Sequence, residues 1–492
     1  MIRFHAISNA TAAIAYFSKS DGYYAAGDLR QEWMGHGAEQ LGLSGTPDFE
    51  HFKRLIHGLD PHTGEQLTSK LIENRIPAWD VTASIPKGVT LALESGDTRI
   101  QDALWEAARE TMSDLEGHAT TRVRKGGQLD DRLTGNLVAF AVEHPETRPA
   151  KADNMPDPDR HLHLVVFNVT RDPVEDEWKA VKFRPIMDLR KLFDRQFDLR
   201  LSSKLTDLGY GIETKRKEGK YYSWDIKGMP ESAVAKFSRR TAEVEKLAAE
   251  LGVGSATGKD KLGATSRQFK RKDMTLEDYR KYWMSRITPM EAHQIAGVIS
   301  DANLGLNPEP TNTADKGVQY AIEHHFERQS VMNWTDLAIT AMERCMGGAT
   351  PEQIDPEARR QGALLKDGQV TTKEVLAEES RIIAFAREGK GTMRPLQSGP
   401  RETRGDAVAA DHDPATSIAL GQQKGRPDES KRPLRTELSG HTATLSPEQQ
   451  AVVSHILESP DRLILVRGAA GTGKTFAMKV TLNRSRPARK YR

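Results

Sequence analysis

Two histidines in a short apolar segment are the residues of this sequence best suited to carry chemistry. His161 and His163 lie in residues 160–169, a run rich in leucine and valine that is bounded by MPDPD before it and TRDP after it. This pattern predicts a buried β-strand. Residues two apart in a strand point to the same face, so the two imidazoles would lie side by side, as metal ligands do. If these two residues are considered without the rest of the sequence, the alternative is that both histidines are simply packed in the core.

Two further residues extend this group. Residues 136–142 form a second predicted strand, which delivers His144 just past its end. Asp80 begins a short alternating segment, residues 80–84, that predicts another strand. Three neutral imidazoles suit a divalent ion that keeps positions open for a substrate oxygen. A carboxylate such as Asp80 would hold one imidazole in a single tautomer, or accept a proton from a nucleophile.

A tyrosine supplies the candidate nucleophile. Tyr16 lies in an alanine-rich segment after Ser8 and Asn9, which are favourable N-caps, and this predicts a helix. Tyr23 and Tyr24 begin seven residues later, about two turns if the helix continues. A phenol has a pKa of about 10, so it attacks a phosphodiester only when a base lies nearby and the phosphate is polarised. The product would be a phosphotyrosine, which would allow the cut strand to be rejoined. Core packing is the alternative role for these tyrosines.

A phosphate-binding loop lies close to the C-terminus. GAAGTGKT at residues 468–475 follows a predicted buried strand at residues 462–466 and precedes a predicted helix, an order typical of a P-loop. The residues expected to bind nucleotide phosphates and magnesium are Gly468, Gly473, Lys474 and Thr475. Seventeen residues follow the loop, so we expect no working ATPase or helicase from this chain, and ATP would bind only to a complete domain.

The overall composition excludes several classes of protein. The 492 residues carry a formal net charge of only +2, so charge neither requires nor excludes a nucleic-acid partner. Basic clusters nevertheless recur at residues 214–220, at residues 267–272 and at the C-terminus. A single cysteine, Cys345, excludes a disulfide framework and fits a reducing cytosol. No apolar run reaches membrane-spanning length and the N-terminus has no signal-peptide pattern, so we expect a cytoplasmic protein without membrane insertion.

The chain divides into four predicted segments. Residues 1–300 would form the domain that carries the histidines and tyrosines, with one long helix at residues 184–210, and residues 301–386 follow as a polar, helical extension. Residues 387–440 are rich in Gly, Pro, Ser, Thr and charge, a composition typical of flexible linkers. Residues 441–492 would begin a P-loop helicase domain that is incomplete.

Five stretches together resemble the conjugative relaxases of the MobF class, the TraI- and TrwC-like members of the HUH endonuclease superfamily. They are AYFSKSDGYYAAGD (residues 15–28), EWMGHGAEQLGLSG (32–45), WDVTASIPKGVTL (79–91), LTGNLVAFAVEH (133–144) and HLHLVVFNVT (161–170). The resemblance covers roughly the first 300 residues and returns at the P-loop, because this family joins a helicase to the relaxase. It implies an α+β fold in which helices flank an antiparallel sheet and the histidine strand is central.

The resemblance also implies roles for individual residues. Tyr16 would be the primary nucleophile, which nicks a plasmid transfer origin and forms a 5′-phosphotyrosine, and Tyr23 or Tyr24 would serve a second strand transfer. Asp80 would orient a histidine or act as a base. The ligands of one divalent ion, Mg²⁺ or Mn²⁺, would be His144, His161 and His163.

The implied partners follow from the same family. They are single-stranded DNA at the transfer origin with an adjacent hairpin, accessory proteins of the relaxosome and the coupling protein of a secretion system. The implied location is the cytoplasm, and also a recipient cell if the protein is transferred with the DNA.

Three features depart from the usual pattern of the family. Phe17 stands where relatives often have a second adjacent tyrosine, so the first tyrosine pair loses its redundancy. The connection between His144 and His161 is longer and richer in proline than usual. SIPKGVT at residues 84–90 replaces the more common SAPKSVS, which would alter how this turn contacts DNA.

Three alternative functions remain open at this point. A rolling-circle replication initiator would share the chemistry, whereas a catalytically silent module would only bind DNA and tether a helicase. A third alternative is an ATP-driven helicase to which the N-terminal domain is accessory. A covalent DNA adduct that requires both Tyr16 and a divalent ion would separate the strand transferase from the silent module.

Overall fold

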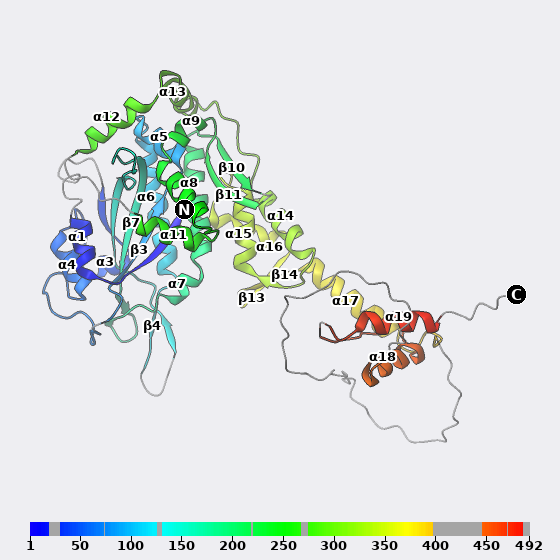
Figure 1. The fold of residues 1–492 in the computed structure, drawn as a ribbon. Helices are drawn as coiled ribbons and strands as arrows, with labels where there is room; N and C mark the ends of the chain where they lie inside the picture. Colours follow the sequence, from blue (N-terminus) through cyan, green and yellow to red (C-terminus); the bar gives the residue numbers. More distant parts are fainter. Residues whose placement is uncertain are drawn as a thin grey trace. The chain divides into compact units, whose positions relative to one another are not determined.

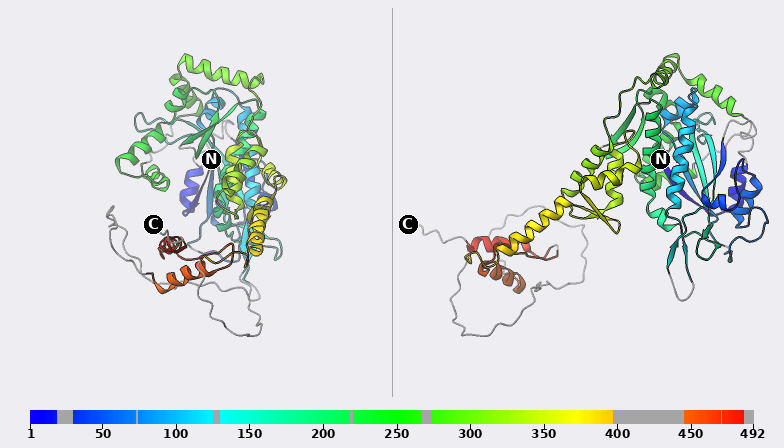
Figure 2. Two further views of the ribbon diagram at one scale, coloured as in Figure 1. Left: turned by 90° about the vertical axis from the view of Figure 1, so that its right-hand side faces the viewer. Right: turned by 180° about the vertical axis from the view of Figure 1, so that it is seen from behind.

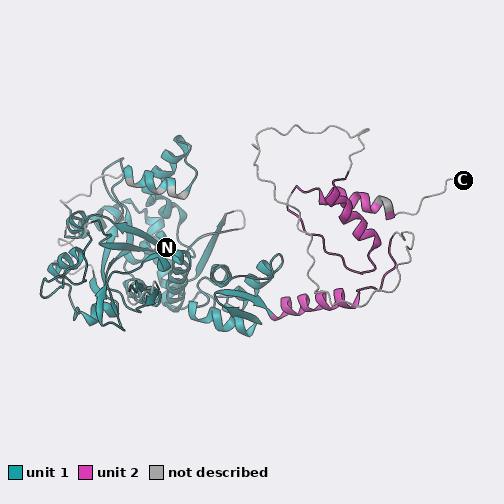
Figure 3. Ribbon diagram, turned by 90° about the horizontal axis from the view of Figure 1, so that it is seen from below, with its two compact units in different colours: residues 1–372 teal, residues 373–492 magenta. Residues whose placement is uncertain are grey.

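The computed structural model describes residues 1–18, 30–72, 74–124, 130–217, 220–266, 274–396, 445–469 and 471–485 (Figure 1). The chain forms two compact units, unit 1 at residues 1–372 and unit 2 at residues 373–492 (Figure 3). Tyr23 and Tyr24 lie outside the described residues, as does most of the predicted linker. The predicted metal ligands all lie in unit 1, and the predicted P-loop lies in unit 2.

A five-stranded antiparallel sheet forms the centre of unit 1, with the strand order β1–β3–β7–β6–β2 (Figure 1). Its strands are β1 (Ile2–Ile7), β2 (Gln31–Met34), β3 (Ala78–Ser84), β6 (Ala139–Glu146) and β7 (Pro158–Phe167). The histidine strand β7 is in the middle, with hydrogen-bonded neighbours on both sides and both faces covered, which explains its continuous apolar sequence. The predicted α+β fold with a central histidine strand is confirmed.

Each face of the sheet packs against its own group of helices, and Figure 2 shows helices on both sides. One face is covered by α5 (Lys87–Glu94), α6 (Arg99–Glu116) and α8 (Arg190–Asp207), and the other by α1 (Ala10–Phe17), α3 (His36–Gln40) and α4 (Phe49–His57). Side chains alternate along β7, so Leu164 enters the first core and Val165 the second. His161 and His163 share the face of Val165, which is the face that α1 covers.

Local signals set the ends of the helices on the histidine side. Asn9 caps α1, because its side-chain oxygen accepts a hydrogen bond from the amide of Ala12 at 2.9 Å. Asp48 caps α4 in the same way through the amide of Glu50 at 2.8 Å. Gly58 ends α4 with a φ of 80°, a backbone conformation that favours glycine. The helix that carries Tyr16 therefore forms where the sequence predicts it, and α4 begins and ends at residues that favour those positions.

The other elements of unit 1 up to residue 303 are short hairpins and helices. The hairpins are β4 (Thr120–Arg122) with β5 (Asp131–Leu133), β8 (Thr170–Asp172) with β9 (Glu177–Lys179), and β10 (Ile212–Lys217) with β11 (Lys220–Ile226). The helices are α7 (Arg184–Asp188), α9 (Glu231–Lys236), α10 (Arg239–Glu250), α11 (Ala256–Thr265), α12 (Leu276–Arg286) and α13 (Pro289–Asn303). The unbroken helix predicted at residues 184–210 is wrong, because the backbone of Leu189 (φ −94°, ψ 5°) leaves the helical region between α7 and α8.

Residues 304–372 contain a small sheet that the helical sequence pattern does not predict. The helices are α14 (Ala314–Phe326), α15 (Trp334–Arg344), the 3₁₀ helix η2 (Pro351–Gln353) and α16 (Ile354–Arg360), and the strands are β12 (Met332–Asn333), β13 (Ala363–Lys366) and β14 (Gln369–Thr372). Asp367 (φ 50°) and Gly368 (φ 74°) form the turn between β13 and β14. An Asp-Gly pair with positive φ at both residues is typical of a two-residue hairpin, so this local signal identifies the strands that periodicity alone misses.

Unit 2 contains three helices among its described residues, α17 (Lys373–Glu388), α18 (Pro447–Glu458) and α19 (Lys474–Ser485). A capping box between Ser446 and Gln449 starts α18, as the sequence predicts. The buried strand predicted at residues 462–466 is wrong, since these residues form no strand and Leu465 is 92% exposed. A strand needs neighbours for its backbone hydrogen bonds, and the part of unit 2 that the structure describes offers none. No helix in the described ranges of the whole chain is long and apolar enough to cross a membrane.

Candidate metal and nucleophile site

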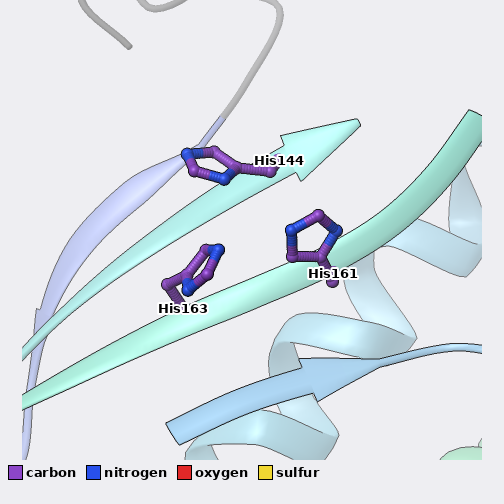
Figure 4. Close-up of side chains that lie close together, drawn as sticks. All are labelled: His144, His161 and His163. Atoms are coloured by element: carbon purple, nitrogen blue, oxygen red, sulfur yellow. The ribbon is translucent and has the colours of Figure 1, made fainter. Parts of the chain in front are cut away.

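Three histidines from the two central strands converge on one side of the sheet (Figure 4). His144 on β6 is paired directly with His161 on β7, and His163 follows two residues along the same strand. One ring nitrogen of each histidine lies within 4.8 Å of those of the other two. Because β6 continues to Glu146, His144 lies within the strand and not past its end, which corrects the prediction. The strand register therefore sets the positions of all three side chains.

The hydrogen bonds of the imidazoles show that this group fits a metal ion. Nδ1 of His163 lies 2.8 and 2.9 Å from the two carboxylate oxygens of Asp80, and Nδ1 of His161 lies 2.7 Å from the carbonyl oxygen of Asp159. Each neutral ring therefore carries its proton on Nδ1 and the lone pair that a metal needs on Nε2. Nε2 of His163 is buried and has no hydrogen-bond partner among the described residues, a deficit that a bound ion would remove.

Asp80 lies where a residue that orients a ligand is expected. It belongs to β3, whose Thr82 is paired with His163 on β7. Burial would raise the pKa of Asp80, but its electrostatic interaction with His163 and the hydrogen bond from that imidazole outweigh burial and hold this pKa below its ordinary value. The carboxylate is thus ionised at neutral pH and accepts the Nδ1 proton of His163.

Tyr16 lies on the last turn of α1, beside the histidines. Its ring centroid is 5.8 Å from the centroids of both His144 and His163, in edge-to-face geometry. The guanidinium carbon of Arg148 lies 5.4 Å from the centre of the same phenol ring. The structure therefore brings Tyr16, Asp80 and the three histidines together from four different elements.

Two of the departures from the family pattern have structural explanations. Phe17 is 4% exposed, and its ring packs edge-on against Phe52 at 5.6 Å and His163 at 5.7 Å, so this position supports the site as part of the core. A Cβ atom at Gly88 would lie 2.4 Å from Oδ1 of Asp225, whose carboxylate accepts the amide of Gly88 at 3.0 Å at the start of α5. A serine here would therefore require the buried carboxylate of Asp225 to move.

The site opens into a cleft of about 1130 Å³. Segments that are distant in sequence line this cleft, including β1, α1, β3, β7, β11, α10 and α11. The cationic side chains along it are Arg3, Lys87, Arg148, Arg195, Arg240 and Lys259. The acidic side chains along it are Asp80, Glu146, Asp159, Asp198 and Glu245, so positive and negative charges nearly balance, and the cations supply individual contacts for the phosphates of a single nucleic-acid strand.

A lysine that the sequence reasoning missed supports one of the ligands from behind. Nζ of Lys87 donates to Oδ1 of Asp159 at 2.8 Å, and the carbonyl oxygen of Asp159 holds Nδ1 of His161. The carboxylate of Asp159 would favour its protonated form through burial, but the charge of Lys87 opposes this and the pKa of Asp159 is below its ordinary value. The sequence shows this lysine in the SIPKGVT turn, but only the three-dimensional structure shows that its partner is Asp159.

A buried charge cluster on the opposite face of the sheet was also missed. Arg160 is 2% exposed and donates to Glu94 at 2.6 Å and to Glu143 at 2.7 Å. Arg160 and Glu143 immediately precede the paired ligands His161 and His144. The cluster therefore ties β6 to β7 directly behind two of the three histidines. The sequence feature that could have predicted this cluster is the presence of charged residues within otherwise apolar strands.

The predicted P-loop residues lie together at the start of α19 in unit 2. Nζ of Lys474 donates to the carbonyl oxygens of Gly468 at 2.6 Å and Ala469 at 2.7 Å. Gly473 has a φ of 73°, a conformation that favours glycine, and Thr475 follows within the first turn of α19. This loop-to-helix arrangement is the one that binds phosphates in P-loop proteins.

Comparisons with known proteins agree with this geometry. A profile of the TrwC relaxase family matches residues 10–290, and a profile of an AAA domain matches residues 444–488. Two proteins described as multifunctional conjugation protein TraI, both from Escherichia coli and one from strain K12, are each 29% identical over 464 and 453 residues. These matches cover 86% and 85% of this chain but only 25% of each relative, so the chain spans about a quarter of the length of the curated relatives it matches.

Solved structures of the conjugative relaxase TrwC are similar to this chain. One complex of TrwC with oriT DNA is 27% identical, with a TM-score of 0.52, and a metal-bound complex is 26% identical, with a TM-score of 0.51. Each similarity covers 60% of this chain and 99% of the TrwC chain in that structure. The resemblance inferred from the sequence motifs is confirmed, because the family profile covers more than half of the 492 residues, and this chain belongs to the TrwC relaxase family.

Proposed function

We propose that residues 1–300 form a metal-dependent relaxase domain, which nicks one DNA strand at a plasmid transfer origin during conjugation. The observation that carries the proposal is the position of Tyr16 beside three histidines that fit a divalent ion. The similar TrwC structures, which are complexes with oriT DNA, support the substrate class. The cation-lined cleft around Tyr16 is consistent with a single DNA strand as the bound form.

The proposed reaction is a transesterification in which the number of phosphodiester bonds is unchanged. The phenol oxygen of Tyr16 attacks the phosphorus and loses its proton, and the bond from phosphorus to the 3′ oxygen of the neighbouring nucleotide breaks. The leaving 3′ oxygen takes up a proton, and the 5′ phosphate remains on Tyr16. The reverse reaction rejoins a strand, and Tyr23 or Tyr24 would serve a second transfer. Asp80 keeps His163 in the Nδ1-protonated tautomer, and this hydrogen bond favours an orienting role for Asp80 over a role as base.

His144, His161 and His163 would hold the metal, which polarises the scissile phosphate when it is bound. We propose Mg²⁺ or Mn²⁺ as the ion that supports the reaction. Imidazole ligands bind late first-row ions more tightly than Mg²⁺, so Ni²⁺, Cu²⁺ and Zn²⁺ are expected to bind this site as well. The hydrogen bonds that His163 donates to Asp80 and that His161 donates to the carbonyl oxygen of Asp159 are expected to strengthen binding of any of these ions.

The other predicted segments and partners belong to the same proposal. Residues 301–386 would be an extension in which helices surround the small sheet of β12, β13 and β14, residues 387–440 a linker and residues 441–492 the start of a helicase domain. ATP would be bound only by a complete P-loop domain. Partners would be an origin hairpin, relaxosome accessory proteins and a secretion-system coupling protein, with the protein acting in the cytoplasm and entering the recipient cell with its DNA.

Formation of a covalent DNA adduct tests the catalytic proposal. Single-stranded origin DNA should yield a protein–DNA adduct that survives denaturation, and the Tyr16→Phe variant should yield none. A Tyr23→Phe/Tyr24→Phe variant is the matched control, since it should still form the first adduct. An adduct that forms equally well after chelation of divalent ions would refute the metal site. A wild-type protein that binds origin DNA without any adduct would instead identify the silent DNA-binding module.

A further inference from the structure

A stack of planar side chains lies at the surface where α14 and α15 meet, outside the catalytic cleft. The guanidinium carbon of Arg344, the last residue of α15, is 3.5 Å from the ring centroid of Tyr320 on α14. The ring of His324, one turn further along α14, lies 5.5 Å from that of Tyr320 with an angle of 8° between their planes. His324 is exposed, whereas Tyr320 and Arg344 are half-buried. The exposed ring of His324 therefore forms the outer end of the stack, and the ring of His325 lies against it at 5.2 Å with an angle of 67° between their planes.

A second guanidinium stands next to this stack. Arg216 on β10 is exposed and donates through Nη2 to the main-chain carbonyl oxygen of Glu343 at 3.2 Å. Because Glu343 immediately precedes Arg344, this hydrogen bond places the guanidinium of Arg216 beside the C-terminal end of α15, and burial and then the positive charge of Arg344 lower the pKa of Arg216. The carboxylate of Glu343 pairs instead with Arg195 at 3.0 Å.

These two arginines have no ion-pair partner among the residues that the structure describes. Like charges held together on a surface are unfavourable, and a bound anion converts this repulsion into attraction. A phosphate suits two guanidiniums particularly well, because each presents paired N–H groups to its oxygens. Phosphate-binding cations beside an open aromatic face are the combination that recognises an unpaired nucleotide.

We propose that Arg216, Arg344, Tyr320 and His324 form a second contact site for single-stranded DNA, in which the arginines bind phosphate and a base stacks on the exposed ring of His324. The site belongs to α14, α15 and β10, and its two helices lie beyond residues 10–290 that the relaxase family profile matches. A duplex hides the faces of its bases, so it would use the phosphate contacts alone.

The β10–β11 ribbon connects this contact site to the catalytic cleft. Ser223 and Trp224 of β11 line the cleft, and Ser223 is paired with Lys215, the neighbour of Arg216. The contact site extends the proposed function, because a strand held in the cleft would continue across this ribbon. Binding of DNA at this contact site does not depend on strand transfer by Tyr16. Binding is therefore measured in the absence of divalent ions, a condition in which no cleavage occurs.

Salt-dependent binding tests the phosphate contacts. Loss of two phosphate contacts in the Arg216→Gln/Arg344→Gln variant should reduce the slope of log affinity against log salt by about 1.4 for an oligothymidylate. The matched control is Arg184→Gln/Arg328→Gln, which removes the same charge from side chains that are 77% and 84% exposed. Equal slopes for the two double variants would overturn the phosphate contacts. The single variant Arg216→Gln repeats the test while Arg344 remains stacked on Tyr320.

Photocrosslinking tests the stacking contact directly. Single-stranded DNA that carries iodouracil should crosslink to the α14 peptide containing Tyr320 and His324, and the His324→Ala variant should lose this crosslink. The same variant should bind oligothymidylate about 5- to 150-fold more weakly at this site. Crosslinks confined to the cleft would overturn the proposal, as would a duplex that competes equally well with the single strand. The adduct assay with Tyr16→Phe reports separately on the proposed function, so either idea can fail alone.

Discussion

Arg160 neutralises two carboxylates that have no solvent exposure, and its replacement by methionine tests how the sheet holds the metal ligands. Its Nε donates to Glu94 at 2.6 Å and its Nη1 to Glu143 at 2.7 Å, and both carboxylate side chains are 0% exposed. Methionine is apolar, so it fills part of the space but removes a guanidinium from both buried carboxylates, which leaves Glu94 with Arg280 and Glu143 with the neutral donors of Gln101 and Trp105. Removal of one partner from a buried ion pair costs about 3–5 kcal/mol, which is a large share of a typical free energy of unfolding of about 5–15 kcal/mol.

The same substitution is expected to weaken metal binding. Glu143 is fixed to Arg160 across the β6–β7 pairing, and the next residues along the two strands are the paired ligands His144 and His161. Loss of the ion pair between Glu143 and Arg160 removes a side-chain link between β6 and β7 and would let the two strands shift where the ligands lie. Loss of residues that hold metal ligands in place typically reduces metal affinity by about 10- to 100-fold.

Urea unfolding and calorimetric Mn²⁺ titration measure the two effects. Trp105, which donates to Glu143 at 3.2 Å, is one of the seven tryptophans whose fluorescence follows the unfolding of the chain. The control is Arg280→Met, which removes a 39% exposed guanidinium that contacts Glu94 at 3.0 Å and should cost about 0–1 kcal/mol. Glu143→Gln provides a milder second variant if Arg160→Met does not fold. Equal unfolding free energies for Arg160→Met and Arg280→Met would refute the reasoning, as would a destabilised Arg160→Met protein with unchanged Mn²⁺ affinity.

Three other substitutions test separate parts of the structure. Asp80→Asn should weaken Mn²⁺ binding by about 10- to 100-fold in calorimetry, because an amide no longer attracts the Nδ1 proton of its histidine partner, and unchanged affinity would argue against a metal at this site. Gly88→Ala should lower the free energy of unfolding by about 1–3 kcal/mol in urea, since its Cβ would meet the carboxylate of Asp225, and a neutral effect would contradict that contact. The hydrogen bond from Lys236 lowers the pKa of Glu291 from 4.5 to about 2. Its contribution to stability is therefore present above pH 4.5 and is lost as the pH falls towards about 2, so Glu291→Gln should flatten the acid side of the stability curve, and an identical curve would exclude this role.

The sequence by itself determined the features that depend on neighbouring residues. Strand periodicity and turn residues predict β7 and place His161 and His163 on one face, and the cap at Asn9 predicts the helix that carries Tyr16. These features are local, because side-chain alternation and capping involve residues only a few positions apart. The Asp-Gly turn at residues 367–368 is also local, and attention to it would have predicted β13 and β14.

Only the tertiary structure decided which distant groups meet at the site. The pairing of β6 with β7 sets His144 opposite His161, and the contacts of Lys87 with Asp159 and of Arg160 with Glu143 bring together residues that no sequence period relates. The exposed apolar segment at residues 462–466 gives the converse case, since its sequence favours a buried strand but the described part of its unit supplies no neighbouring strand. Strand pairing and burial are interactions between separated segments, so their outcome depends on the whole packed fold and not on the pattern of any one segment.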